Sequence, residues 1–183
     1  MKKYISLIFI FGFFFLFESC SSQAYLDSKT VDTLVGSEEF TFNAQRANPM
    51  NYEVINAIGS IQNAPTSRIL QLQGGGYSIE LKKNNMDVAL PYFGRMYNAS
   101  YNSSETGYRF VSKDFTVNKS QNKKGNWTLK IKPNDVRNVD QINIEVFKNG
   151  KAFVSIQSND RQPITYDGYV SENQKIEKEK EKL

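Results

Sequence analysis

Apolar and polar residues alternate with a period of two through most of the chain after Phe40. The clearest case is the segment 127–132, in which Trp, Leu and Ile alternate with Thr and Lys. Successive side chains of a β-strand point to opposite faces of a sheet, so this spacing predicts strands with one apolar and one polar face. The same pattern predicts strands near residues 40–44, 69–72, 77–81, 86–90, 108–110, 115–117, 142–146, 152–156 and 164–170.

Turn residues separate these strands at short intervals. Asn149-Gly150 is a strong hairpin signal because Gly adopts positive φ at little cost. Before the first strand, Val31, Leu34 and Val35 have helical spacing, which predicts one short helix over 30–39. In residues 48–68, Ile55, Ile58 and Ile61 are compatible with either a turn of helix or a loose extended connection. The sequence therefore predicts an all-β fold, an antiparallel up-and-down barrel or sandwich of about nine short strands with one N-terminal helix.

The first twenty residues are typical of an export signal. Lys2 and Lys3 precede an apolar run from Ile5 to Phe17, and Ser19 is a small residue directly before Cys20. The run is too short to span a hydrocarbon core of about 30 Å. We expect cleavage before Cys20 and lipidation of that cysteine, with palmitate among the attached acyl chains. An uncleaved membrane anchor is the alternative.

This interpretation divides the chain into four parts. Residues 1–19 form the signal peptide, 20–29 a lipidated tether, 30–171 the antiparallel β domain and 172–183 a charged flexible tail. The predicted location is the cell envelope, with the lipid on Cys20 binding the outer membrane and the domain facing the periplasm. No acidic run follows Cys20, which argues mildly against display on the cell surface.

The composition excludes several kinds of chemistry. The chain has no His and one Cys, which removes Ser-His-Asp and Cys-His catalysis and the usual catalytic zinc sites. No cofactor or metal is expected, and we predict that the protein is not an enzyme. The net charge of +4 comes from scattered residues, and a nucleic-acid reader would carry a basic stripe, so nucleic-acid binding is not expected. Pairs of carboxylates keep a hydrolase open as a less favoured alternative.

The segment from Pro91 to Arg95 is the most unusual in the domain. It forms either an aromatic lip whose Arg95 binds an anionic or sugar ligand, or a structural corner in which Arg95 binds backbone carbonyls or a carboxylate. We favour the corner, and the same choice applies to Arg161. If the lip is correct, the ligand-binding residues are Tyr92, Arg95, Tyr97 and Arg161. Tyr97, Tyr101 and Tyr108 fit a carbohydrate surface, but tyrosines at sheet ends more often cover the core.

Four short motifs resemble one known family. They are Phe-Thr-Phe-Asn-Ala from Phe40, Leu-Pro-Tyr-Phe-Gly-Arg from Leu90, Asn-Gly-Lys-Ala from Asn149, and Ser-Asn-Asp-Arg-Gln-Pro-Ile-Thr-Tyr from Ser158. Together they are similar to the DUF4251 family of Bacteroidota lipoproteins, over about residues 30–170. The resemblance implies an all-β lipoprotein of the cell envelope and implies no activity.

The predicted function is a non-catalytic binding or envelope-assembly module whose protein or small-molecule partner is unknown. A barrel holding one small apolar ligand is the first alternative, because small closed barrels can enclose such a molecule. A packed interior would favour the binding or assembly module over the ligand-holding barrel. A cleft with two facing acids would favour the hydrolase.

Overall fold

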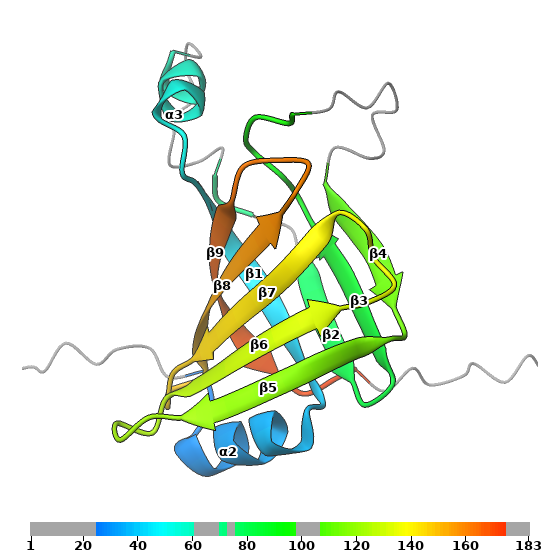
Figure 1. Ribbon diagram of the computed structural model, residues 1–183. Coiled ribbons are helices and arrows are strands. Elements are labelled where there is room, and N and C mark those ends of the chain that lie inside the picture. Colours follow the sequence, from blue (N-terminus) through cyan, green and yellow to red (C-terminus); the bar gives the residue numbers. More distant parts are fainter. Residues whose placement is uncertain (1–24, 61–69, 73–75, 98–106, 175–183) are drawn as a thin grey trace, which may run out of the picture.

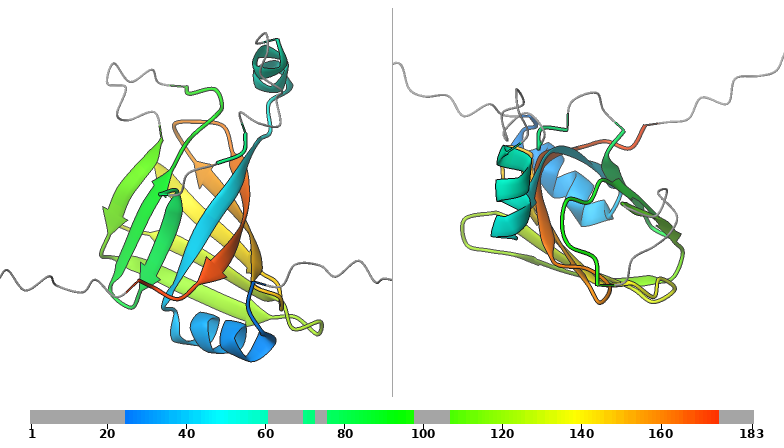
Figure 2. Two further views of the ribbon diagram at one scale, coloured as in Figure 1. Left: turned by 180° about the vertical axis from the view of Figure 1, so that it is seen from behind. Right: turned by 90° about the horizontal axis from the view of Figure 1, so that it is seen from above.

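The computed structural model describes residues 25–60, 70–72, 76–97 and 107–174. Nine strands form one antiparallel sheet in the order β4-β3-β2-β1-β9-β8-β7-β6-β5. The sheet curls into a nearly closed barrel (Figures 1 and 2). This confirms the predicted all-β fold. The strands are β1 (Phe40–Pro49), β2 (Ser78–Lys82), β3 (Asn85–Leu90), β4 (Tyr108–Ser112), β5 (Phe115–Gln121), β6 (Trp127–Pro133), β7 (Val139–Val146), β8 (Lys151–Ser158) and β9 (Ile164–Ser171).

The barrel is joined at β1–β9 and left open between its two edge strands, β4 and β5. A two-residue turn connects these edges, and Asp135 on the β6–β7 connection fixes it. The Asp135 carboxylate accepts hydrogen bonds from Ser112 Oγ at 2.5 Å and from the amide of Lys113 at 2.8 Å. These bonds, the Ser112 hydroxyl first, lower the pKa of Asp135. A local polar network therefore holds the two edges together where the ladder is interrupted.

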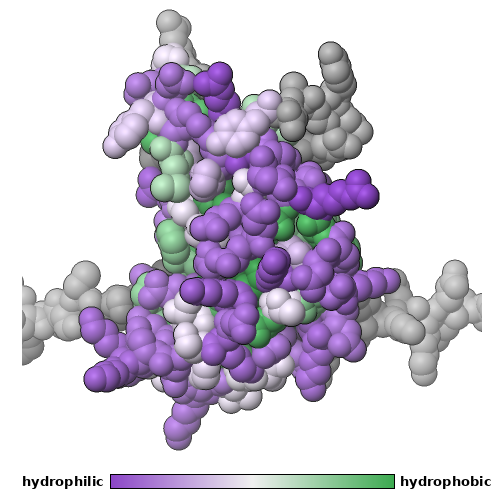
Figure 3. Space-filling view, viewed as in Figure 1, coloured by the Kyte–Doolittle hydropathy of each residue, from purple (hydrophilic) through white to green (hydrophobic). Residues whose placement is uncertain are grey.

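The barrel interior is packed with apolar side chains. The inward positions of the strands are buried, and Phe40, Phe42 and Tyr166 are among the largest side chains with no solvent exposure. Figure 3 shows that the outer face in that view is covered mainly by hydrophilic residues. The residues that alternate along each strand thus divide between an apolar interior and a solvent-facing exterior, as the sequence predicts.

Gly168 marks the closest approach between two strands. The register of β1 on β9 shifts between Ala44 and Arg46, which is a bulge in β1. Opposite the bulge, a Cβ on Gly168 would overlap the carbonyl oxygen of Asn43. A glycine is required at this position because the two backbones meet with no room for a side chain.

Helix α2 (Ser28–Ser37) covers one end of the barrel (Figures 1 and 2). The Asp27 carboxylate caps it by accepting hydrogen bonds from the amides of Lys29 and Thr30 at 2.9 and 3.1 Å. Val31 and Val35 are buried in the core. Trp127 Nε1 donates a hydrogen bond of 2.7 Å to Asp32 on the outer side of the helix. The helix therefore closes the barrel with its apolar stripe and binds the rim with its polar face.

A second helix, α3 (Tyr52–Gly59), lies in the region that the sequence left unassigned. It stands away from the barrel beyond the end of β1, and none of its residues is fully buried (Figure 1). Asn51 caps it by accepting a hydrogen bond from the amide of Glu53 at 2.7 Å. Its half-buried residues Val54, Ile55 and Ile58 have helical spacing, but eight residues are too few for that pattern to exclude an extended connection.

Two predicted boundaries differ from the structure. The first helix begins at Ser28 and ends at Ser37, because Glu38 adopts a left-handed φ of 60° that terminates it. The strand predicted at 69–72 is replaced, within the described residues, by an isolated antiparallel bridge between Gln71 and Arg46. Leu70 and Leu72 instead cover the bulge in β1, with Ala47 N donating to Leu70 O at 2.9 Å.

The described helices are short. None of them is long and apolar enough to cross a membrane. The predicted signal peptide and Cys20 lie outside the described residues, as does the predicted tail from residue 175 onward.

Candidate functional site

The unusual segment after Leu90 lies at the barrel end opposite α2. Pro91 ends β3, and residues 95–97 then run antiparallel to residues 160–162 of the β8–β9 loop. Tyr97 N donates to Asp160 O at 2.8 Å, and Gln162 N donates to Arg95 O at 3.1 Å. Two segments more than sixty residues apart in the chain are therefore joined by backbone hydrogen bonds.

Arg161 lies at the centre of this end, with a side chain that is only 5% exposed. Its guanidinium carbon is 5.1 Å from the ring centre of Tyr92 and 4.9 Å from that of Tyr108. These two rings meet edge to face at 5.8 Å. Both distances suit attraction between a cation and an aromatic face, which strengthens where water is excluded.

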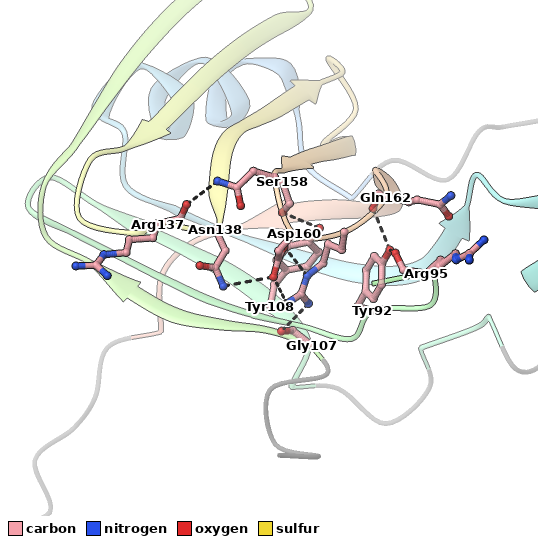
Figure 4. Close-up of polar contacts among 11 residues, drawn as sticks. Tyr92, Arg95, Gly107, Tyr108, Arg137, Asn138, Ser158, Asp160 and Gln162 are labelled. Carbon is pink, nitrogen blue, oxygen red and sulfur yellow. Dashed lines mark hydrogen bonds and ion pairs between the residues drawn. The ribbon is translucent and has the colours of Figure 1, made fainter. Parts of the chain in front are cut away.

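Asp160 supplies the counter-charge for Arg161. Arg161 Nε donates to Asp160 Oδ1 at 3.0 Å, and Nη2 donates to Oδ2 at 2.9 Å, which is a bidentate pair. Arg161 Nη1 donates to the carbonyl of Gly107 at 3.2 Å (Figure 4). Burial alone would lower the pKa of Arg161, but the hydrogen bonds and charge of Asp160 outweigh it and raise that pKa. We call Arg161, Asp160, Tyr92 and Tyr108 the arginine latch.

Three tyrosine hydroxyls fix the strands around the arginine latch. Tyr92 Oη lies 2.9 Å from Arg95 O and 3.1 Å from Gln162 O (Figure 4). Tyr108 Oη accepts from Ser158 Oγ at 3.2 Å, and Tyr166 Oη donates to Pro91 O at 2.6 Å. Burial raises the pKa of Tyr108 to about 12 and also raises the pKa values of Tyr92 and Tyr166. All three phenols are therefore neutral at physiological pH.

Gly94 is explained by close approach. Its φ is not in the left-handed region, so backbone conformation alone does not require a glycine here. A Cβ on Gly94 would overlap the hydroxyl of Tyr92. That hydroxyl folds back onto the segment to reach Arg95 O. The glycine leaves space for the bond that closes the corner.

The structure brings two of the four predicted ligand-binding residues together and leaves two outside. Tyr92 and Arg161 meet in the arginine latch, where their polar groups bind protein atoms. Tyr97 is 61% exposed. The expectation that the Arg95 side chain binds buried acceptors is wrong, because Arg95 is exposed and only its backbone takes part. Arg161 fills the role assigned to Arg95, since its position in the loop points it inward.

The sequence pointed to Arg161 as a candidate residue, but it did not identify the residues that Arg161 contacts. The adjacent acid Asp160 was a usable signal, because a bidentate pair needs a carboxylate close by. Tyr108 covers the core at 3% exposure, which confirms the structural reading of that residue. Tyr101 lies outside the described residues.

The arginine latch is built to hold strands. Its guanidinium is sealed by protein groups, and its tyrosines resist ionisation. Among the described residues, no group of three or more Asp, Glu, His or Cys side chains is placed to hold a metal ion. The carboxylates of Asp135 and Asp160 are each engaged by hydrogen bonds that organise loops.

Comparison with known proteins identifies the family. Residues 23–170 match the sequence profile of a domain of unknown function, DUF4251, which is most of the chain. The chain belongs to the DUF4251 family. A crystal structure of a DUF4251 family protein from Bacteroides eggerthii is similar, with a TM-score of 0.48 and 12% identity. That alignment covers 79% of this chain and 87% of the other. No curated protein matches the chain at a significant level.

Proposed function

We propose that this protein is an exported lipoprotein, anchored through Cys20 to the periplasmic face of the outer membrane. Its DUF4251 domain acts as a non-catalytic binding or assembly module. The observation that carries the proposal is the position of the exposed apolar side chains. Four large hydrophobic side chains are exposed among the described residues, and one of them, Val111, lies on β4. The other three, Met50, Tyr52 and Tyr97, are 64%, 81% and 61% exposed and belong to the segments that extend from the arginine-latch end.

The residues around these side chains support a binding role. Arg95, Arg109 and Arg137 are exposed at the same end, on segments joined to the arginine latch or beside it. Protein interfaces are enriched in Tyr, Met and Arg and depleted in Lys. The first described residue, Tyr25, is bound at the α2 end, where Tyr25 N donates to Asn149 O at 2.9 Å. A lipid on Cys20 would therefore leave the Tyr52 and Tyr97 surface free to meet a partner.

The packed interior favours this proposal over an apolar-ligand barrel. Helix α2 covers one end, and Tyr108, Tyr166 and Arg161 fill the other, with exposures of 3%, 0% and 5%. An enclosed ligand would have to displace these side chains. Binding at the exposed surface requires no such change.

Fractionation of cells tests the anchor. Replacing Cys20→Ala should release the protein into the soluble periplasmic fraction and abolish labelling by a fatty-acid analogue. Unchanged membrane association would contradict the lipoprotein proposal and favour an uncleaved signal anchor.

Crosslinking in cells tests the binding surface. A photoreactive residue in place of Tyr52 or Tyr97 should give discrete adducts of defined mass. The matched control is the same residue in place of Lys130, an exposed outward position on β6. No adduct at Tyr52 and Tyr97, or the same adducts at Lys130, would contradict binding through this end.

A further inference from the structure

Two turns at the α2 end bring together three lysines. Lys123 and Lys124 lie in the β5–β6 turn, and Lys148 lies in the β7–β8 turn. A Cβ on Gly125 would overlap Cε of Lys148, so the Lys148 side chain lies across the neighbouring turn. All three residues are exposed, and the β5–β6 turn projects beyond the other strand connections at this end (Figure 1). We call these three residues the lysine tip.

No acid pairs directly with the lysine tip. Within the described part of the chain, none of its three ammonium groups forms an ion pair. Glu38 at this end is paired with Lys119 at 2.8 Å. Asp27 and Asp32 keep their negative charges but are bound by neutral donors, Asp27 by the first turn of α2 and Asp32 by Trp127 Nε1.

Two further exposed acids, Glu39 and Glu172, lie near the C-terminal end of α2. Glu39 precedes β1 and Glu172 follows β9, and these two strand ends are paired through Thr41 and Ser171. A ten-residue helix is about 15 Å long, so it separates those acids from the side at which the chain enters.

The chain enters the fold beside the lysine tip. Leu26 N donates to Asn149 O at 3.3 Å, in the same turn as Lys148. The Tyr25 ring stacks on Tyr169 with centroids 4.5 Å apart, which fixes the tether on the outer wall. Four residues lie between Cys20 and Tyr25, and the five Cα-to-Cα steps that join the two positions span at most about 17 Å. If Cys20 carries a lipid, as proposed above, this end must stay close to the membrane surface.

We propose that the lysine tip is a docking surface for anionic lipid headgroups, which holds the domain with its α2 end toward the bilayer. The tether keeps the domain close to the membrane, and the three lysines set which end of the domain faces it. Each Lys close to an anionic surface contributes about 1 kcal/mol, which corresponds to about a fivefold change in partitioning. Contact of this kind would keep the Tyr52 and Tyr97 surface pointing away from the membrane.

Flotation with lipid vesicles tests the proposal without the lipid anchor. The protein is residues 20–183 with Cys20→Ala, which contains every described residue. Vesicles contain phosphatidylcholine alone or a mixture with phosphatidylglycerol. We expect binding only to the mixture, and loss of binding when salt reduces the Debye length to about 3 Å.

Matched variants identify the surface. Replacing Lys123, Lys124 and Lys148 by Gln should lower partitioning by roughly tenfold to a hundredfold. The control replaces Lys113, Lys130 and Lys132 by Gln, which removes the same charge from exposed positions elsewhere. It should change partitioning by less than about threefold, because those charges lie outside the contact. The double variant K123Q/K124Q leaves Lys148 in place over Gly125 and should give an intermediate loss.

Two results would overturn the proposal. Equal losses in the tip and control variants would show only a response to net charge. Absence of any preference for phosphatidylglycerol at low salt would show that the lysine tip does not bind anionic lipid. Because the tested chain carries Cys20→Ala, either result is independent of whether Cys20 is lipidated in the cell.

Discussion

The two ends of the barrel are closed by different chemistry. At one end α2 places Val31 and Val35 in the core, and the closure is apolar and continuous with the chain before β1. At the other end the arginine latch closes the barrel with a buried cation, a carboxylate and two aromatic rings. The comparison shows that an end can be sealed by a local helix or by a polar cluster assembled from distant loops.

Closure by the arginine latch depends more on the contacts of a single residue than closure by α2 does. Removing a charge from water is costly, and only paired, hydrogen-bonded groups offset that cost. Arg161 meets this condition through Asp160, Gly107 and two tyrosine rings. The arginine latch therefore fixes the path of two loops, and those loops carry the Tyr97 and Arg95 side chains to the surface.

The largest expected effect comes from removing the cation. Arg161→Ala leaves Asp160 with a mostly buried charge and empties the space between Tyr92 and Tyr108. We expect the free energy of unfolding to fall by about 3–5 kcal/mol. Arg161→Lys should lose less stability, because lysine keeps the positive charge but cannot donate the two parallel hydrogen bonds of the guanidinium. Urea melts measure the free energy of unfolding of both variants. A loss below about 1 kcal/mol for Arg161→Ala would show that the arginine latch does not stabilise this end of the barrel.

A smaller loss is expected at the apolar end. Val35→Ala removes two buried methyl groups, so the free energy of unfolding should fall by about 2 kcal/mol. Ser37→Ala, exposed on the same helix, is the control and should change it by less than about 0.5 kcal/mol. The Val35→Ala and Arg161→Ala losses should add, since the two sites share no contact in the fold. A strongly non-additive double variant would break the separation of the two ends.

The two ends should also respond to opposite extremes of pH. Burial raises the pKa of Tyr108 to about 12. The folded state therefore holds this proton more tightly than the unfolded state, whose tyrosine pKa is about 10. The stability from the arginine-latch end is fully present below about pH 10 and is lost as pH rises toward 12. Tyr108→Phe should flatten this alkaline loss in urea melts.

The stability contributed by the α2 end depends on pH in the opposite direction. Hydrogen bonds from Thr30, its hydroxyl first, and from Lys29 lower the pKa of Asp27. Its contribution is present above the unfolded value of about 4 and is lost as pH falls below it. Asp27→Asn should flatten the acid side of the stability profile and leave the alkaline side unchanged. A change on the alkaline side would contradict the assignment.

The smallest effect is expected at Arg95, an exposed arginine of the arginine-latch end. Arg95 is exposed, and its backbone alone joins the β8–β9 loop. Arg95→Ala should change the free energy of unfolding by less than about 0.5 kcal/mol, as surface changes usually do. This pair sharpens the comparison, because Arg95 and Arg161 are joined through one short backbone ladder. A large loss at Arg95 would show a side-chain partner that the described structure does not contain.

The strands could be predicted because their signal is local. In segments such as 127–132, each residue's side is set by the period of two, and the structure buries Leu129 and Ile131 accordingly. The first helix was predictable from Val31 and Val35 for the same reason. Helix α3 was left open, because the spacing of Ile55 and Ile58 over eight residues fits either a turn of helix or an extended connection.

The arginine latch could be predicted only in part. Both Arg95 and Arg161 stand beside turn residues, and the one local difference between them is the acid Asp160 directly before Arg161. The pairing of residues 95–97 with 160–162 decides which one is buried by turning one side chain inward and the other outward. Such pairing depends on strand order in the closed barrel, which a single sequence does not contain.

The account as a whole assigns one end to the membrane and the other to a partner. The rate at which a membrane-impermeant maleimide labels Ser120→Cys or Tyr97→Cys tests this most directly, since Cys20 is the one native cysteine. Ser120 is exposed on β5 beside the lysine tip, so this substitution keeps all three lysines. The lipidated protein is compared in phosphatidylglycerol vesicles and in detergent. The account predicts that vesicles slow labelling at position 120 and leave position 97 unchanged. Equal rates at both positions in both conditions would contradict it.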